Sequence, residues 1–319
     1  MKALVSIIIP VYNRISLIEE TLRSIQNQSY TNWECILVDD HSTDGTYSFL
    51  QGFVKLDSRF KLFSRPNFLL KGANACRNYG FNKSKGLYVK WYDSDDIMLE
   101  KHLETAVNTL ESSSYNFVVV DSVNFNHNTG EILGRHYNWL RDDLKISALN
   151  FANYSNAWTT LDFVAIRDTL NITFDERLKS GQEYNFFVRF LIDYVKGQGH
   201  FIDEILSHRR IHRDSIGNRY SNLNAKPKLK ERLDVEYLTL KAIEESKNKS
   251  IISFFLKTSI DLSYTLAKEH SSLRYIGGIT RHVLLNLGFI NAVSYFLSII
   301  LGLTLKKGHK FNKLVKKDL

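Results

Sequence analysis

From residue 4 to about residue 120, the chain alternates short apolar runs with longer segments whose apolar residues recur about every 3.6 positions. The apolar runs, rich in Val and Ile, are predicted to be strands at 5–9, 35–38, 61–63, 87–91 and 117–120. The segments between them are predicted to be helices at 16–28, 43–56, 71–82 and 97–111. Strands that alternate with helices in this way build a mainly parallel sheet with helices on both faces.

The rest of the chain divides into a less regular stretch and a helical one. Residues 121–160 carry irregular patterns rich in Asn, typical of loops that cover a site. Further elements are predicted as strands at 162–167 and 199–211, and as helices at 182–195, 228–247 and 251–268. We therefore expect an α/β domain over 1–220 and a helical region over 221–319.

The composition is that of an ordinary globular protein, with 44% hydrophobic and 24% charged residues over 319 positions. Cys35 and Cys76 occur without a CxxC pair, which favours reduced thiols and a cytoplasmic location. The apolar run at 4–9 is too short for a signal peptide and ends at Pro10, so we expect a buried strand there.

The net charge of +8 comes from the last third of the chain. Residues 221–319 hold 17 Lys or Arg against 8 Asp or Glu, and the rest of the chain is close to neutral. Basic surfaces attract nucleic acids or anionic membranes. The tail lacks the interleaved basic and aromatic residues of single-strand binders, so nucleic acid is not an expected partner.

No charged residue occurs from 283 to 305, and lysines then follow at Lys306, Lys307, Lys310, Lys313, Lys316 and Lys317. About 20 apolar residues can cross a bilayer as a helix. On a helix over this stretch, however, polar residues would gather on one side: Asn286, Asn291, Ser294 and Ser298. We rank a helix lying on a membrane surface first, a buried helix second and a spanning helix third. The lysines would suit the anionic inner face of a cell membrane.

The stretch from Tyr88 to Asp96 ends in three carboxylates within four positions, Asp93, Asp95 and Asp96. Like charges held this close repel one another unless a cation lies among them, and hard divalent cations prefer oxygen ligands. The stretch therefore predicts a metal and phosphate site. The alternative is that one Asp caps a helix beginning near Ile97, which would explain only one of the three.

Further polar residues follow the first two predicted strands. Pro10, Tyr12, Asn13 and Arg14 come after the first, and Asp39 and Asp40 after the second. In mainly parallel sheets, ligands bind beyond the carboxyl ends of the strands, where acidic residues can accept hydrogen bonds from a base N–H or from ribose hydroxyls. Alternatively, residues 42–44 cap the next helix and Asp40 only orders the loop.

A helix over 71–82 would carry Asn74, Arg77 and Asn78 on one face, because they are three and four positions apart. A guanidinium there could balance phosphate charge beside the acidic stretch. An ordinary solvated face would show the same pattern. The chain has no GxGxxG after its first strand and no GxxxxGKS or GxxxxGKT sequence, which argues against dinucleotide oxidoreductases and P-loop enzymes.

The chain contains three segments in order: VSIIIPVYNR, ILVDDHSTDGT and ANACRNYGFNKSKGLYVKWYDSDD. Together they resemble the nucleotide-binding half of the family 2 glycosyltransferases, closely over 4–100 and more loosely to about 216. The resemblance implies a GT-A fold, with a nucleotide-binding half at 1–100 and an acceptor half at 101–220. It also implies inverting, metal-dependent transfer from a nucleotide-diphosphate sugar, most often a UDP-sugar, with Mg²⁺ or Mn²⁺.

The resemblance implies roles for single residues as well. Asp39 would contact the nucleotide base, Asp95 the ribose or diphosphate, and Asp96 the metal, in the manner of the family's DXD motif. The sequence DSDD contains two overlapping registers of that motif, so Asp93 is also a candidate metal ligand. Further candidate donor-binding residues are Pro10, Tyr12, Asn13, Arg14, Asp40, Asn74 and Arg77.

Two later segments extend the resemblance. Residues 174–184 resemble the segment of the family's catalytic base, usually a Glu-Asp pair, where this chain has Gln182 and Glu183. Glu183 would be the base; alternatively it only begins a helix, whose dipole favours a carboxylate. Residues 208–215 resemble a Y-R-x-H-x-x-S element, in which Arg210 would face the diphosphate and His212 would contact phosphate or metal. A plain basic surface strand is the alternative.

The family and the tail together suggest a glycan or lipid-linked acceptor and surface polysaccharide assembly at the inner face of the cell membrane. Two alternatives stay open. A sugar nucleotidyltransferase has a similar nucleotide fold, although its glycine-rich N-terminal loop is missing here. A non-catalytic sugar-nucleotide-binding assembly protein is compatible with the carboxylate missing at Gln182.

Overall fold

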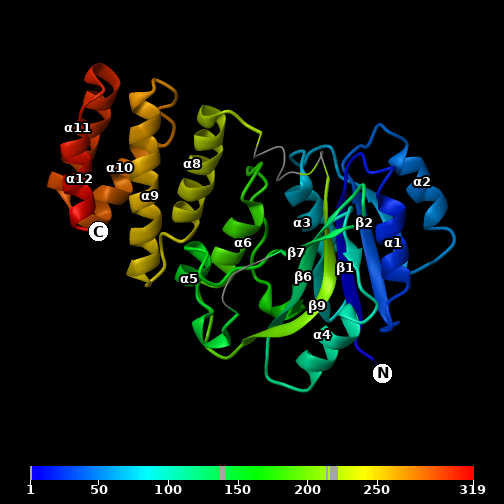
Figure 1. The fold of residues 1–319 in the computed structure, drawn as a ribbon. Coiled ribbons are helices and arrows are strands. Elements are labelled where there is room, and N and C mark those ends of the chain that lie inside the picture. Colours follow the sequence, from blue (N-terminus) through cyan, green and yellow to red (C-terminus); the bar gives the residue numbers. More distant parts are fainter. Residues whose placement is uncertain (1, 137–140, 213–214, 216–221) are drawn as a thin grey trace. The chain divides into compact units, whose positions relative to one another are not determined.

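The computed structural model describes residues 2–136, 141–212, 215 and 222–319 (Figure 1). The chain forms two compact units. The first consists of Met1–Arg177 and Asp193–Ser215, and the second of Leu178–Ile192 and Ile216–Leu319. The domain boundary expected between residues 220 and 221 involves positions outside the described residues. The second unit includes the segment that carries Glu183.

The first unit begins with the predicted alternation of strands and helices. Four parallel strands lie in the order β3-β2-β1-β4, with bounds β1 (Val5–Val11), β2 (Trp33–Asp39), β3 (Phe60–Ser64) and β4 (Tyr88–Trp91). The helices of this part are α1 (Ile18–Gln26), α2 (Thr46–Phe53), α3 (Ala73–Lys83) and α4 (His102–Glu111). The predicted sheet with flanking helices is confirmed.

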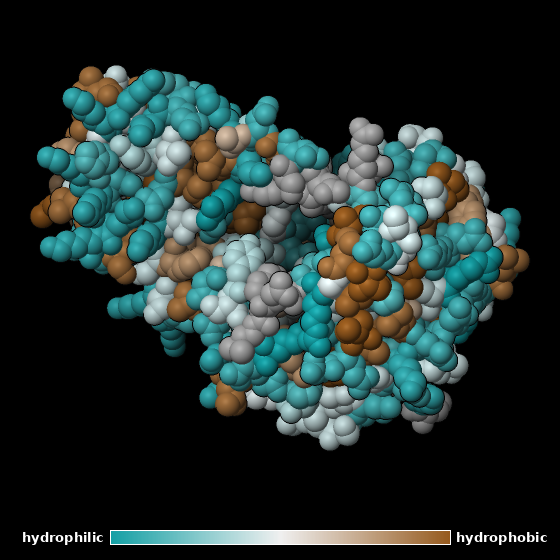
Figure 2. Space-filling view, viewed as in Figure 1, coloured by the Kyte–Doolittle hydropathy of each residue, from teal (hydrophilic) through white to brown (hydrophobic). Residues whose placement is uncertain are grey.

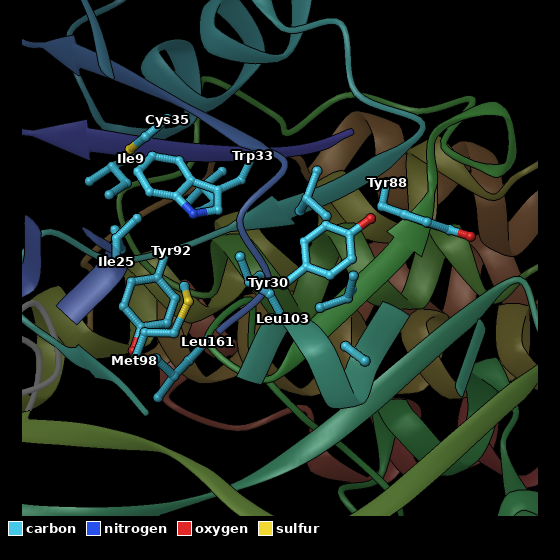
Figure 3. Close-up of a cluster of buried hydrophobic side chains, with 14 of the residues drawn as sticks. Ile9, Ile25, Tyr30, Trp33, Cys35, Tyr88, Tyr92, Met98, Leu103 and Leu161 are labelled. Carbon is cyan, nitrogen blue, oxygen red and sulfur yellow. The ribbon is translucent and has the colours of Figure 1, made fainter. Parts of the chain in front are cut away.

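Helices cover both faces of these strands, because successive side chains of a strand point to opposite sides. Ile9 of β1 packs into one hydrophobic core with Ile25 of α1 and Leu103 of α4 (Figure 3). Ile8 points to the other face, where α3 comes so close that a Cβ added to Gly80 would lie 2.5 Å from the Cγ2 of Ile8. Fully burying one such aliphatic side chain stabilises a fold by about 1.5–3 kcal/mol. This packing fixes α3 against the strands.

The second half of the sheet is mixed and continues from β4 in the order β8-β6-β9-β5. Its strands are β5 (Ile97–Met98), β6 (Phe117–Asn126), β7 (Ile132–Arg135), β8 (Phe163–Ile166) and β9 (Gly199–Ile211). β8 is antiparallel to both β4 and β6, β9 is parallel to β6, and β7 pairs with β6. The stretch expected to be irregular also contains the short helices η1 (Asp143–Lys145) and α5 (Ala148–Ala152), and η2 (Arg167–Thr169) follows β8.

The helix predicted over 97–111 begins later than expected. Ile97 and Met98 form β5, which pairs antiparallel with His208 and Ser207 of β9, and α4 begins only at His102. The prediction was wrong at the first residues because a long-range strand pairing outweighs the local helical pattern. Among the residues that the structure describes, no side chain caps α4. The alternative that an aspartate of the acidic stretch caps this helix is therefore wrong.

The second unit is helical, with α6 (Gln182–Phe190), α8 (Ala225–Ala242), α9 (Lys249–Lys268), α10 (Ile276–Leu287), α11 (Phe289–Leu305) and α12 (His309–Lys317). The single helix expected over 283–305 does not form, because Gly288 separates α10 from α11. Gly288 has φ 83° and ψ 177°, a conformation that is essentially restricted to glycine. Within the described residues, none of the helices combines the length and the apolar character needed to cross a membrane.

Candidate active site

The carboxyl ends of β1, β2 and β4 meet at one edge of the sheet, since β1 pairs in parallel with both neighbours. The loops after β1 and β2 are tied together through Asn13. Its backbone N–H donates to Ser42 Oγ at 2.9 Å, and its Oδ1 accepts from the backbone N–H of Thr43 at 2.8 Å. The backbone N–H of Arg14 donates to Thr46 Oγ1 at 2.8 Å. The two loops therefore hold each other in place.

Asp39, at the end of β2, has a buried carboxylate that is only half satisfied. Its Oδ2 accepts from the backbone N–H of Ser42 at 3.0 Å. Its Oδ1 is buried and has no hydrogen-bond partner among the described residues. An unsatisfied buried acceptor costs roughly 1–3 kcal/mol. A ligand N–H or O–H group would remove this cost, which agrees with the predicted contact to a nucleotide base.

Asp40, the next residue, is occupied by the protein itself. Its carboxylate forms a buried ion pair with Arg65, which also donates to the backbone carbonyl of Leu69 at 2.6 Å. Sequence reasoning missed Arg65. The contact follows from the parallel register of β2 and β3. This register pairs Asp39 with Ser64 and so brings Asp40 and Arg65 to the same level. The ion pair orders the segment that follows β3.

Pro10 and Tyr12 differ in accessibility. Pro10 is buried within β1, opposite Val38 of β2. Tyr12 is 40% exposed, and Lys71 Nζ lies 4.1 Å from the centroid of its ring. An exposed ring beside a cation can stack on a base and attract a phosphate. Lys71 was not singled out from the sequence.

Asp95 and Asp96 lie beyond β4 and have different partners. Asp95 Oδ2 accepts from Arg14 Nε at 3.2 Å and lies 2.9 Å from Nε2 of His212. Asp96 Oδ1 accepts from the backbone N–H of Arg210 at 2.8 Å. The structure therefore brings Arg14 and His212, two of the predicted site residues, onto one carboxylate.

Burial and nearby charge act differently on these two carboxyls. Burial raises the pKa of Asp96 well above its ordinary value, and the charges of Asp95 and Asp93 raise it further. Burial also acts to raise the pKa of Asp95, but the hydrogen bond from His212 and the charge of Arg14 outweigh it and hold that pKa below its ordinary value. A further cation would favour ionisation of Asp96, because opposite charge stabilises a carboxylate.

Two oxygens of this pair are available to a cation. Asp95 Oδ1 and Asp96 Oδ2 accept no hydrogen bond from any residue that the structure describes. Carboxylate oxygens suit Mg²⁺ and Mn²⁺, so the donor atoms fit the expected metals. Across the described chain, no three His, Cys, Asp or Glu side chains form a ready metal site. A cation would thus need more oxygen ligands, such as those of a diphosphate.

Arg210 is buried and is occupied by the protein. Its Nε donates to the backbone carbonyl of Asp95 at 2.7 Å, its Nη2 donates to Glu20 at 2.5 Å, and its Nη1 lies 3.0 Å from Nδ1 of His127. The guanidinium also lies over the ring of Phe125, 4.7 Å from its centroid. The residue expected to face a diphosphate therefore holds the backbone of the acidic stretch. Sequence reasoning missed Glu20 and His127, which are far from Arg210 in the chain.

The polar face predicted on the helix over 71–82 lies on α3 and is largely buried. Arg77 Nη2 donates to Asp93 at 2.8 Å. Asn74 and Asn78 hydrogen-bond the backbone of residues 174 and 175 at 2.7–3.0 Å. The alternative of a solvated face is wrong for Asn74 and Arg77, which are 1% and 4% exposed. The face joins the acidic stretch to the segment just before the second unit.

Glu183 lies in the first turn of α6 in the second unit and is half-buried. α6 begins after Gly181, at φ 60°, and has no side-chain cap. A carboxylate in the first turn is stabilised by the helix dipole. Gln182 Nε2 donates to the carbonyl of Leu178 within the same unit, at 3.1 Å. This position is compatible with both interpretations of Glu183, the catalytic base and the carboxylate that begins a helix.

Two known proteins are similar to about a third of the chain. The putative teichuronic acid biosynthesis glycosyltransferase TuaG of Bacillus subtilis is 44% identical over 108 residues, which are 32% of this chain and 42% of that protein. The GalNAc(5)-diNAcBac-PP-undecaprenol beta-1,3-glucosyltransferase of Campylobacter jejuni is 39% identical over 100 residues, 31% of this chain and 32% of that protein. The chain thus covers less than half the length of these relatives.

A solved structure is similar over nearly the whole chain. Residues 1–349 of TarS from S. aureus, in complex with UDP-GlcNAc, superpose with a TM-score of 0.66 at 17% identity, covering 99% of this chain and 91% of that one. The family model "Glycosyl transferase family 2" matches residues 6–168, just over half of the chain. This match agrees with the motifs at the ends of β1, β2 and β4, and so the chain belongs to the family 2 glycosyltransferases, with the GT-A fold.

Proposed function

We propose that the enzyme transfers a sugar from a nucleotide-diphosphate donor, first of all a UDP-sugar, to a glycan or lipid-linked acceptor, with inversion at the anomeric carbon. The observation that carries the proposal is the pairing of Asp95 with Asp96 at the carboxyl edge of the sheet. One carboxylate is balanced by Arg14 and His212, and the other is buried beside the like charges of Asp95 and Asp93, which add to the effect of burial in raising its pKa. Such a pair suits a divalent cation and the diphosphate that accompanies it.

The nucleotide would bind at the loops after β1 and β2. The unpaired Oδ1 of Asp39 would accept an N–H of the base, and the exposed ring of Tyr12 with Lys71 would flank it. Asn13 holds these loops together, and Arg14 brings positive charge toward the diphosphate. The complex of TarS with UDP-GlcNAc supports a uridine nucleotide as the first candidate.

Mg²⁺ or Mn²⁺ would be held through Asp95 Oδ1 and Asp96 Oδ2. When bound, such an ion supplies positive charge that stabilises the diphosphate leaving group. Asp93 and His212 are the other candidate ligands, and they engage Arg77 and Asp95. Arg210 contributes by holding the backbone of Asp95.

Glu183 would act as the catalytic base. It would take the proton of the acceptor hydroxyl while that oxygen forms its bond to the anomeric carbon and the bond from this carbon to the diphosphate breaks. A positioned base contributes about 10²- to 10⁴-fold in rate. The family usually has an acidic residue at the position of Gln182 as well. Because Gln182 cannot accept the proton, Glu183 is the candidate base in this segment.

The relatives and the tail support a proposed acceptor and a proposed location. The functions named for the B. subtilis and C. jejuni relatives are teichuronic acid biosynthesis and glucosylation of an undecaprenol-linked glycan, and they support surface polysaccharide assembly. We place the enzyme in the cytoplasm at the inner face of the cell membrane, where a lysine-rich tail meets anionic lipid. Family membership argues against the sugar nucleotidyltransferase alternative.

A donor screen tests the proposal. The purified protein with Mn²⁺ is heated with UDP-, GDP- and dTDP-sugars, and the donors that raise its melting temperature are then incubated with an undecaprenol-linked glycan acceptor. The expected result is stabilisation by one UDP-sugar and release of UDP only when the acceptor is present. Stabilisation without any release under these conditions would favour the non-catalytic binding protein. Stabilisation by no nucleotide-sugar would contradict the proposal.

A further inference from the structure

Helix α11 is amphipathic, but its polar side is buried in the protein and its apolar side is exposed. The residues that it buries include its polar and small ones, Asn291, Ala292, Ser294, Tyr295, Ser298, Ile299 and Gly302. The residues that it exposes are large and apolar, Phe289, Ile290, Val293, Phe296, Leu297 and Ile300. On a helix, positions 289, 293, 296 and 300 fall on one stripe. The sequence suggested a helix whose polar side faces water, but this polar side packs against protein.

The buried side of α11 faces α9 and α12. Tyr295 Oη hydrogen-bonds Ser263 Oγ of α9 at 2.8 Å. Asn291, at the start of α11, donates to Asp318, just after α12, at 2.8 Å. The start of α11 thus meets the end of α12, and the two helices form an antiparallel pair. Asn291, Tyr295 and Ser298 thus form their hydrogen bonds within the protein, and the apolar side is left outward.

Helix α12 exposes both lysines and apolar residues. Asn312 and Lys316 on its inner side bind Asp261 of α9, at 3.0 and 2.6 Å. Its exposed residues include Lys310, Phe311, Lys313, Leu314 and Lys317. α11 and α12 pack against each other and both bind α9 with their inner sides, so the exposed sides of both helices face away from α9. Together they form one apolar and basic surface, the α11–α12 outer face. Figure 2 shows hydrophobic side chains among hydrophilic ones at the left edge of the region that these helices occupy in Figure 1.

An apolar stripe of this length on the surface of a soluble protein marks an interaction site. The side chains of Phe289 and Ile290 are 73% and 77% exposed, so these two residues belong to the surface and not to the core. Two occupants fit an apolar stripe with flanking lysines, an anionic bilayer and a second copy of the chain. A second copy would bring its own Lys310, Lys313 and Lys317 against those of the first, and like charges repel. An anionic lipid surface attracts them instead.

We infer that the α11–α12 outer face docks on the surface of an anionic lipid bilayer, with the apolar stripe inserted among the acyl chains and the lysines against phosphate headgroups. Helices that lie in the interface bind in this way, through apolar area plus electrostatic attraction. The docking surface deepens the proposed membrane location and rests on it for its biological setting. Its test measures vesicle binding and not sugar transfer, so either proposal can fail without the other.

Flotation with vesicles tests the inference on the full-length protein. Vesicles of phosphatidylcholine with about 30% phosphatidylglycerol, an anionic lipid, are compared with vesicles of pure phosphatidylcholine. The wild type should float with the anionic vesicles. Phe296→Glu with Ile300→Glu should weaken binding at least about tenfold. Lys310→Gln with Lys313→Gln and Lys317→Gln should weaken it by on the order of a hundredfold, and high salt should do the same to the wild type.

A matched control carries the same type of change elsewhere. Leu56→Glu with Val195→Glu replaces two exposed apolar residues of the first unit, 84% and 60% exposed, and should float like the wild type. Melting temperatures check that all variants fold. A wild type that stays unbound, or a Phe296→Glu, Ile300→Glu variant that floats as well as the wild type, would overturn the inference. So would a wild-type dimer in sedimentation that this variant converts to a monomer, without vesicle binding by either.

Discussion

Asp95 and His212 lie 117 positions apart in the sequence, yet the carboxylate Oδ2 and the ring Nε2 are 2.9 Å apart in the structure. The contact joins the loop after β4 to the residue just beyond β9. It also helps to hold the pKa of Asp95 below its ordinary value, against the effect of burial. His212 is therefore a residue that keeps Asp95 ionised and oriented.

His212→Ala should weaken nucleotide-sugar binding. The change removes one of the two side chains that contact Asp95 Oδ2, and a hydrogen bond to a charged group contributes about 1.5–3 kcal/mol. Donor affinity, measured by calorimetry at fixed Mn²⁺, should fall roughly 10- to 150-fold. His309→Ala removes an exposed histidine on α12 and serves as the control. Unchanged affinity in His212→Ala would show that Asp95 needs only Arg14.

Asp39→Asn should change which nucleotides bind. The amide can still accept from Ser42 with its oxygen, but it then presents an NH₂ group where Asp39 presents its unpaired Oδ1. An acceptor for a base N–H becomes a donor, so UDP affinity should fall by about tenfold or more. Competition binding of UDP, GDP and dTDP checks this result. If the substitution weakens the binding of diphosphate alone as much as the binding of UDP, Asp39 does not contact the base.

Glu183→Gln should keep donor binding and lose turnover. The substitution preserves size and hydrogen bonding but removes the group that would accept the proton, so kcat should fall about 10²- to 10⁴-fold. Donor affinity should stay within about twofold of the wild type, since the proposal gives Glu183 no part in donor binding. Glu204→Gln alters an exposed glutamate of β9 and is the matched control. A kcat close to that of the wild type would remove Glu183 from the role of base.

Much of the first unit follows from local patterns in the sequence. Buried strands such as β1 are nearly continuous apolar runs, so their existence and their order along the chain can be predicted from the pattern of apolar residues. The polar residues directly after β2 and β4 then fall at one edge of the sheet by topology. The position of Asp39, Asp95 and Asp96 at this edge could therefore be predicted before any coordinates.

The partners of these residues could not be predicted in the same way. Arg65 reaches Asp40 only through the register of β2 with β3, and Arg210 reaches Glu20 only through the packing of β9. A strand pairing with a residue far away in the sequence can also outweigh a short helical pattern. Ile97, for example, lies in β5 and pairs with β9. In α11, the side that contacts protein is the polar one, which hydrophobic periodicity alone assigns to solvent.

Glu236 should make the stability of the second unit depend on pH. Burial raises the pKa of its carboxyl to about 7, and the Arg232 guanidinium 3.7 Å away only partly offsets this effect. The folded state binds this proton more tightly than the unfolded state does. The contribution of Glu236 to the free energy of unfolding is therefore fully present below pH 4.5 and is lost as the pH rises through about 7. The change is on the order of 3 kcal/mol.

Thermal unfolding at pH 5 and pH 8 measures this dependence. Glu236→Gln should raise the melting temperature at pH 8 relative to the wild type and flatten the difference between the two pH values. Glu245→Gln, at an exposed position after α8, should leave the wild-type dependence intact. A pH dependence of the same size in Glu236→Gln would assign it to other groups.

The most direct test of the central claim is calorimetric titration of UDP into the wild type and Asp96→Asn, each with Mn²⁺ and with a chelator. Asp203→Asn, which alters an exposed carboxylate on β9, is the control for the substitution. The account predicts that Mn²⁺ strengthens UDP binding to the wild type and to the control by at least about tenfold and has no such effect on Asp96→Asn. Equal UDP affinity of the wild type with Mn²⁺ and with chelator, or an undiminished Mn²⁺ effect in Asp96→Asn, would contradict it.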